Sequence, residues 1–147
     1  MSVQQPLPER LRPDDLNLFL GQSHLGERLR SLMQAKRLPS LLFFGPPGCG
    51  KSTLALLLAK GTGKKYLRLS APEAGLQHLR RALTGVEVLV LDEPVDGLDP
   101  VMRRQVWSLV LSDVAEHGTT VLVSSHNLRE LEDVCDHVGI MDHGHVL

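Results

Sequence analysis

The 147 residues predict a three-layer α/β domain built around a mostly parallel five-stranded sheet. Short apolar runs alternate along the chain with longer segments in which apolar residues recur every three or four positions, the spacing of one helix face. Most of the short runs show no polar alternation, as in parallel strands that are buried on both faces. The expected strands are residues 40–44, 66–69, 87–91, 119–123 and 138–141.

Helices are expected in the intervals between these strands. Asp99 and Pro100 supply an N-cap residue followed by a proline in the first helical turn, and Gly118 is placed to end that helix. Asn127 and Glu130 have the spacing of a capping box at the start of a later helix. A helix is also expected over residues 52–60. In the other expected helices the apolar positions on one face are Leu25, Leu29, Leu32 and Met33; Leu76, Leu79 and Leu83; Met102, Val106, Leu109, Val110 and Val114; and Leu128, Leu131 and Val134.

Length and composition indicate one domain, residues 1–147, with a core of Leu, Val and Ala, because aromatic residues make up only 3% of the chain. No apolar run approaches the roughly 18 residues of a membrane span, and the N-terminus lacks the pattern of a secretory signal. The two cysteines, Cys49 and Cys135, form no disulfide framework and suit a reducing compartment. We therefore expect a cytoplasmic domain.

Charge is divided unevenly along the chain. Residues 1–84 carry 13 Lys and Arg against 5 Asp and Glu, a net charge of +8, whereas residues 85–147 carry 3 against 12, a net charge of −9. This division indicates either two segments of different ancestry that meet near Gly85 or a nucleic-acid-binding face. No Lys/Arg run with interleaved aromatic residues is present, so the sequence favours a nucleic-acid partner only weakly.

The segment Gly45–Ser52 matches the phosphate-binding pattern G-x-x-x-x-G-K-[ST] at every position. A Gly-rich loop can match by chance, but this one lies between an expected strand and an expected helix, the context that the pattern requires. Lys51 is expected to neutralise the β- and γ-phosphates of ATP, and the Ser52 hydroxyl to bind Mg²⁺. Cys49 is either an oxidisable thiol or a small side chain that the loop tolerates. The residues expected to bind the nucleotide are Gly45, Pro46, Pro47, Gly48, Cys49, Gly50, Lys51, Ser52 and Thr53.

An apolar run, Val88–Leu91, ends in two carboxylates. Asp92 at the end of a buried strand is costly unless it serves a partner, and a water-bridged Mg²⁺ is the natural one. Glu93 is placed to polarise a water for attack on the γ-phosphate, although an Asp-Glu pair could also cap a turn. His126 follows the fourth expected strand and is interpreted as a γ-phosphate contact or as a surface residue. The predicted catalytic residues are thus Lys51, Glu93 and His126, and the predicted metal ligands are Ser52 and Asp92.

The first part of the chain carries six strings that recur together in one family: Pro6–Pro13, Phe19–Leu25, Leu38–Ser40, Gly45–Ser52, Leu69–Ala71 and Glu73–Gly75. On these strings residues 6–83 resemble the start of an AAA+ ATPase of the replication-associated recombination type, which is related to clamp loaders and Holliday-junction helicases. The resemblance implies that Arg-Pro and Gly-Gln segments pack near the adenine, which places Arg12, Pro13 and Gln22 at the nucleotide.

The second part carries the strings Leu91–Pro94, Gly97–Pro100 and Ser124–His126. On these, residues 86–147 resemble the second half of an ABC transporter ATPase, which implies a Walker B segment with catalytic Glu93, a D-loop at Asp99 and a switch histidine at His126. Both families share a P-loop NTPase fold in which one strand lies between the phosphate-loop strand and the Asp-Glu strand. The two resemblances together indicate an engineered or recombined chimera of an AAA+-like segment, 1–84, and an ABC ATPase-like segment, 85–147.

Three functions remain open from the sequence. The first is an ATP–Mg²⁺-binding domain with weak intrinsic hydrolysis, because the chain lacks both the Leu-Ser-Gly-Gly-Gln signature of ABC ATPases and the arginine finger of AAA+ proteins. The second is a chimera that binds nucleotide or serves as a scaffold without hydrolysis. The third is a DNA-processing AAA+ type ATPase. A transporter subunit is least favoured, because the segments that couple to membrane partners are missing.

Overall fold

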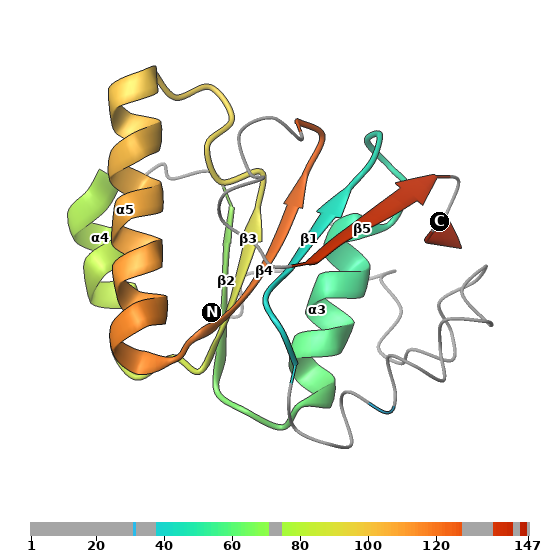
Figure 1. The fold of residues 1–147 in the computed structure, drawn as a ribbon, viewed down its shortest axis with the longest axis horizontal. Coiled ribbons are helices and arrows are strands. Elements are labelled where there is room, and N and C mark those ends of the chain that lie inside the picture. The colour runs from blue at the N-terminus through green and yellow to red at the C-terminus, as the bar shows by residue number, and fades with distance from the viewer. Residues whose placement is uncertain (1–30, 32–37, 71–74, 128–136, 143–144, 147) are drawn as a thin grey trace, which may run out of the picture.

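The computed structural model describes Ser31 and residues 38–70, 75–127, 137–142 and 145–146 (Figure 1). Ser31 is helical, as expected for the first predicted helix, but the rest of that helix lies outside the described residues. So do the helix predicted to follow Asn127 and the segments Pro6–Pro13 and Phe19–Leu25.

The described part of the chain alternates strands with helices in the predicted order. The elements are β1 (Leu41–Phe44), α3 (Lys51–Gly61), β2 (Tyr66–Ser70), α4 (Gly75–Ala82), β3 (Val88–Asp92), α5 (Pro100–His117), β4 (Thr120–Ser125), β5 (His137–Asp142) and β6 (His145–Val146). The strands form one sheet in the order β2-β3-β4-β1-β5-β6. All pairings from β2 to β5 are parallel, which confirms the predicted five-stranded parallel sheet, and the two-residue β6 adds an antiparallel edge beside β5. Strand β4 lies between β1 and β3, as the P-loop fold requires.

Helices cover both faces of this sheet, with α3 on one face and α4 and α5 on the other (Figure 1). Strand β3, which lies between β2 and β4, shows how the sequence produces this arrangement, because its four apolar residues alternate between the two layers. Leu89 and Leu91 belong to the cluster beneath α4 and α5, whereas Val88 and Val90 pack with α3. The three-layer architecture predicted from the continuously apolar strands is therefore confirmed.

Helix α5 begins and ends at the residues that the sequence indicated. The Asp99 side chain accepts a hydrogen bond from the Met102 backbone N–H at 2.9 Å, and Gly118 ends the helix with a left-handed φ of 67°. Val106, Trp107 and Val110 are buried against the sheet. Within the described ranges, no helix is long and apolar enough to cross a membrane.

Candidate functional site

The carboxyl ends of three neighbouring strands meet at one edge of the sheet. Asp92, the last residue of β3, pairs in register with Ser124 of β4, and Phe44 at the end of β1 pairs with Ser125. Two backbone hydrogen bonds fix the loops that follow: Glu93 N–H to the Ser124 carbonyl at 2.9 Å, and Gly45 N–H to the Ser125 carbonyl at 3.3 Å. In open α/β sheets this edge is where ligands bind.

The loop between β1 and α3 has the backbone of a phosphate cradle. Gly48 and Gly50 have φ values of 78° and 93°, in the left-handed region that side chains disfavour. A Cβ at Gly48 would meet no atom within 4 Å, so the dihedral angle rather than space requires glycine there. Gly50 caps α3 without a side-chain hydrogen bond, and the first turn of the helix carries no acid. The positive end of α3 is thus available to an anion.

A cavity of about 370 Å³ lies against this loop. It is lined by Pro47, Gly48, Gly50, Lys51, Ser52, Thr53, Asp92 and Glu93. Residues from the loop, from the first turn of α3 and from the end of β3 therefore share one concave surface.

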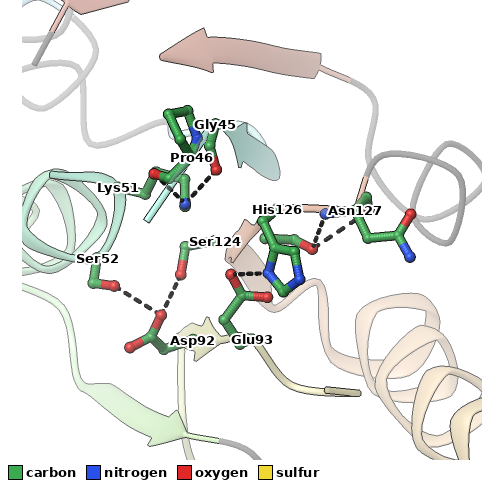
Figure 2. A network of polar contacts seen from close by, with 10 residues as sticks. Gly45, Pro46, Lys51, Ser52, Asp92, Glu93, Ser124, His126 and Asn127 are labelled. Atoms are coloured by element: carbon green, nitrogen blue, oxygen red, sulfur yellow. Dashed lines mark hydrogen bonds and ion pairs between the residues drawn. The ribbon is translucent and has the colours of Figure 1, made fainter. Parts of the chain in front are cut away.

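Lys51 is buried at the base of the loop, with 7% of its surface exposed. Its ammonium group donates hydrogen bonds to the carbonyls of Gly45 and Pro46, the latter at 3.0 Å. These bonds offset part of the cost of burying the charge. Figure 2 shows the ammonium group directed at these two carbonyls.

Asp92 is held through both of its carboxylate oxygens. Its Oδ1 accepts hydrogen bonds from Ser52 Oγ at 2.7 Å and from Ser124 Oγ at 2.6 Å (Figure 2), and its Oδ2 lies 3.5 Å from Arg68 Nη2. Burial raises the pKa of Asp92, but the two hydroxyl donors and the Arg68 charge outweigh it, so the pKa lies below the ordinary 3.8. Asp92 is therefore an ionised acceptor at neutral pH.

Glu93 and His126 form a hydrogen-bonded pair at the same edge of the sheet, which is an ion pair when the imidazole ring is protonated. His126 Nδ1 lies 2.9 Å from Glu93 Oε1 (Figure 2), and the hydrogen bond to Glu93, followed by its charge, raises the pKa of His126 above 6.5. Glu93 also has a φ of 45°, a left-handed conformation that is unfavourable for a residue with a side chain. The predicted catalytic carboxylate is thus held by its backbone in a strained conformation and by its side chain against the histidine.

The residues at this edge fit a Mg²⁺ ion that also binds phosphate. Ser52 Oγ and Asp92 Oδ1 bring two oxygen donors within 2.7 Å of each other beside the cavity. No group of three or more His, Cys, Asp or Glu side chains among the described residues could hold a metal alone. Mg²⁺ commonly takes one or two protein oxygens and fills its remaining positions with water and substrate phosphates, so this small oxygen set suits it.

The structure brings together Lys51, Ser52, Asp92, Glu93 and His126, predicted from three separate motifs. Cys49 differs from the rest of its loop, because its side chain is buried in the core cluster behind α3. Whether Cys49 contributes to nucleotide binding stays a prediction. Arg12, Pro13 and Gln22, which were predicted to lie near the adenine of the nucleotide, are outside the described residues.

Two residues at the site, Ser124 and Arg68, were not among those predicted. Ser124 is 1% exposed and directly opposite Asp92 in register. A buried hydroxyl at the end of an apolar strand, two residues before His126, is a signal that could have identified it. Arg68 comes from β2, and only the lateral order of the strands brings it to Asp92.

A glycine-rich loop from a strand into a helix, with an Asp-Glu pair two strands away across β4, defines the P-loop NTPase class. The chain belongs to the family of the Holliday junction DNA helicase RuvB P-loop domain, whose family model matches residues 11–115. The fold also matches the Thermotoga maritima RuvB Holliday junction branch migration motor with a TM-score of 0.66 and 25% identity, over 89% of this chain and 48% of that one. The domain is thus an AAA+-related, ATP-binding type of P-loop domain.

Relatives of both predicted kinds are found. An AAA domain-containing protein of Mycobacterium tuberculosis is 34% identical over 130 residues, which are 84% of this chain and 29% of that protein. Replication-associated recombination protein A of Haemophilus influenzae is 41% identical over 81 residues, 53% of this chain and 18% of the relative. Bacitracin transport ATP-binding protein BcrA of Enterococcus faecalis is 43% identical over 61 residues, 42% of this chain and 20% of the relative. The chain spans less than a third of the length of each of these proteins.

The backbone strain at Glu93 can be measured by comparing two substitutions that both remove its carboxylate. Glu93→Gly is expected to be more stable than Glu93→Ala by about 1 kcal/mol, because only glycine adopts a positive φ without cost. Urea unfolding of both variants gives the difference. The same pair at Asp96, which has no positive φ, is the control and should show the reverse order, with alanine the more stable. If the alanine variant is the more stable at both positions, the backbone of Glu93 is not strained.

The Glu93–His126 ion pair predicts a pH-dependent contribution to stability. The pKa of His126 is raised on folding, so the protonated ring stabilises the protein fully below the unfolded value of 6.5, and this contribution is lost as pH rises through the folded value. The melting temperature of the parent minus that of His126→Gln should therefore fall as pH rises from about 6 to about 8.5. His78→Gln, on the exposed surface of α4, serves as the control. A difference that grows with pH would exclude the pair as the cause.

Proposed function

We propose that the domain binds ATP with Mg²⁺ and hydrolyses it slowly on its own. The observation that carries this proposal is the cavity into which Lys51, Ser52, Asp92 and Glu93 converge from a glycine-rich loop, a helix N-terminus and a strand end. These supply a cation, a hydroxyl and two carboxylates, the groups that phosphoryl transfer to water requires.

Each residue has a role that follows from its position. Lys51 exchanges its two loop carbonyl acceptors for the β- and γ-phosphate oxygens. Ser52 and Asp92 would hold Mg²⁺, and the ion would neutralise phosphate charge. Glu93 orients the attacking water, and His126 donates to the γ-phosphate. In this proposal the 2.9 Å bond from His126 to Glu93 keeps both side chains at the mouth of the cavity.

Slow turnover is proposed because this sequence lacks groups that act across the interface between two ATPase subunits. No Leu-Ser-Gly-Gly-Gln segment lies between Lys51 and Asp92. This chain therefore has no signature segment to offer to the nucleotide site of an ABC-type partner. Arginine fingers contribute about 10³–10⁵ in rate where they are present. Glu93 and His126 by themselves supply positioning without that additional charge.

We also propose the chimeric origin, with a junction near Gly85. Support comes from the two kinds of relative, because the recombination protein and the bacitracin transport protein each match about half of the chain. The match of 130 residues to one AAA domain-containing protein, and the family match across residue 85, limit how different the two ancestors were. Both segments come from P-loop domains with the same strand order.

Two substitutions test binding and hydrolysis separately. Lys51→Ala should weaken ATP binding about 10- to 100-fold in calorimetry with Mg²⁺, because it removes charge-assisted hydrogen bonds. Glu93→Gln should keep binding and lower steady-state phosphate release by about 100-fold or more. Lys60→Ala removes the same charge from the exposed end of α3 and is the matched control.

The outcomes distinguish the proposed ATPase from the alternatives. Unchanged affinity in Lys51→Ala would refute the proposed nucleotide site. Parent binding without any Glu93-dependent phosphate release would identify a nucleotide-binding scaffold that hydrolyses nothing. Absence of binding in the parent would mean that the fold forms without a working site.

A DNA-responsive ATPase is a second candidate, favoured by a groove between α4 and α5. This groove, about 530 Å³, is lined by Arg80, Arg104, Gln105, Ser108, Ser112, Leu76 and Leu109. Its described lining contains two guanidinium groups and several neutral donors but no acid. A surface of this composition suits the phosphates of a nucleic acid strand. The family name of the matched domain, a Holliday junction DNA helicase, points the same way.

Neighbouring arginines on α4 allow a matched test of this second candidate. Arg80→Glu should weaken binding of a single-stranded oligonucleotide and make it less salt-dependent, by about 0.7 in the slope of log K against log salt for each phosphate that the variant no longer binds. Arg81→Glu makes the same charge change outside the lining of the groove. Fluorescence anisotropy at several salt concentrations gives both slopes. Equal decreases in affinity in the two variants, or no binding and no DNA-stimulated turnover in the parent, would end this candidate.

A further inference from the structure

Arg68 is the charged partner of the predicted metal ligand Asp92, although it belongs to neither nucleotide motif. It lies in the middle of β2, where it pairs in register with Val90, and its side chain reaches two positions along the sheet to Asp92. The guanidinium Nη2 is 3.5 Å from Asp92 Oδ2, and both side chains are 23% exposed. An ion pair with this degree of burial is screened less than a surface pair.

The two oxygens of Asp92 have different partners. Oδ1 accepts from the neutral hydroxyls of Ser52 and Ser124, on the side of the carboxylate next to the phosphate loop. Oδ2 is the oxygen next to Arg68. The orientation of the carboxylate therefore has three supports, of which only Arg68 is charged.

We propose that Arg68 is an internal counter-charge for Asp92, which stabilises the carboxylate without metal and thereby sets how much Mg²⁺ the nucleotide site requires. This inference rests on the proposed function, because it concerns the same site. Arg68 acts through Asp92 and is a positioning residue, with no contact to the phosphate loop required.

The sign of the effect follows from comparing the two consequences of removing Arg68. The first is loss of orientation, which is small because Ser52 and Ser124 still hold Oδ1 at 2.7 and 2.6 Å. The second is loss of the positive charge of Arg68 next to Asp92. Arg68 and Mg²⁺ are both positive, and their repulsion across one carboxylate is large in a partly buried site. Removing the charge of Arg68 should therefore destabilise the metal-free protein and make Mg²⁺ bind more readily.

Thermal unfolding measures both consequences without relying on catalysis. We would compare the parent, Arg68→Met and Arg68→Lys in EDTA, and then with saturating ATP over a series of MgCl₂ concentrations. Arg68→Met keeps the length of the side chain and removes its charge, whereas Arg68→Lys keeps the charge and loses the planar fork. Arg81→Met, at an exposed position of α4 outside the cavity and outside the groove between α4 and α5, controls for the change in net charge.

Arg68→Met should melt at a lower temperature than the parent in EDTA and reach half of its ATP-dependent stabilisation at about threefold to tenfold less Mg²⁺. Arg68→Lys should keep a Mg²⁺ midpoint within about twofold of the parent, because the charge is retained. In the Asp92→Asn background Arg68→Met should have little effect in EDTA, since the charge it neutralises is gone. Should Arg68→Met fail to fold, Arg68→Gln makes the same comparison with a polar side chain.

The inference is overturned if Arg68→Met needs as much Mg²⁺ as the parent or more, which would leave Arg68 a structural ion pair. It is also overturned if Arg68→Lys shifts the Mg²⁺ midpoint as far as Arg68→Met. If the parent shows no stabilisation by ATP and Mg²⁺ at any concentration, the proposed function fails and this inference with it. Failure of this inference can be told apart from failure of the proposed function, because in the first two cases ATP and Mg²⁺ still stabilise the parent.

Discussion

The parallel pairing of β4 between β1 and β3 brings the phosphate loop and the Asp-Glu strand together at one edge of the sheet. It sets the end of the phosphate-loop strand beside Ser125 and the end of the Asp-Glu strand beside Ser124. A slip of one residue in either pairing would turn alternate side chains to the opposite face of the sheet. Asp92 would then face away from Ser124, and the hydroxyl that fixes its carboxylate would be lost. The observed register runs without interruption from Val88 opposite Thr120 to Asp92 opposite Ser124, so the strand pairing also determines the geometry of the site.

Electrostatic balance at this edge is achieved by pairing each charge within the chain. Lys51 is bound by two carbonyls, Asp92 by two hydroxyls and Arg68, and Glu93 by His126. Partly buried charges without such partners would cost several kcal/mol each. These internal partners must be exchanged or shared when phosphate and a divalent cation enter. The free energy of nucleotide binding is therefore the difference between two states in which the charged groups have partners, one with internal partners and one with phosphate and a divalent cation. A side chain such as Arg68 can change this difference without contacting the nucleotide.

The sequence predicted the order of elements and most of the site because both depend on local patterns. Short apolar runs located β1 to β5 within one or two residues, and the cap at Asp99 located the start of α5. The motifs located Lys51 and Asp92 because a phosphate cradle needs a fixed order of residues over a short span. Arg68 could not be predicted in the same way. Its contact depends on which strands are neighbours, and periodicity carries no information about lateral order.

The positive φ of Glu93 was also beyond the sequence, for a related reason. A glutamate gives no local signal for the left-handed region, so its conformation must be imposed by the structure around it. That constraint is visible in the hydrogen bond from the Glu93 N–H to the Ser124 carbonyl. Ser124 thus holds the backbone of Glu93 through its main chain and the carboxylate of Asp92 through its side chain. One residue of β4 thus couples both acids to the core, and loss of its hydroxyl would leave Asp92 held only by Ser52 and Arg68.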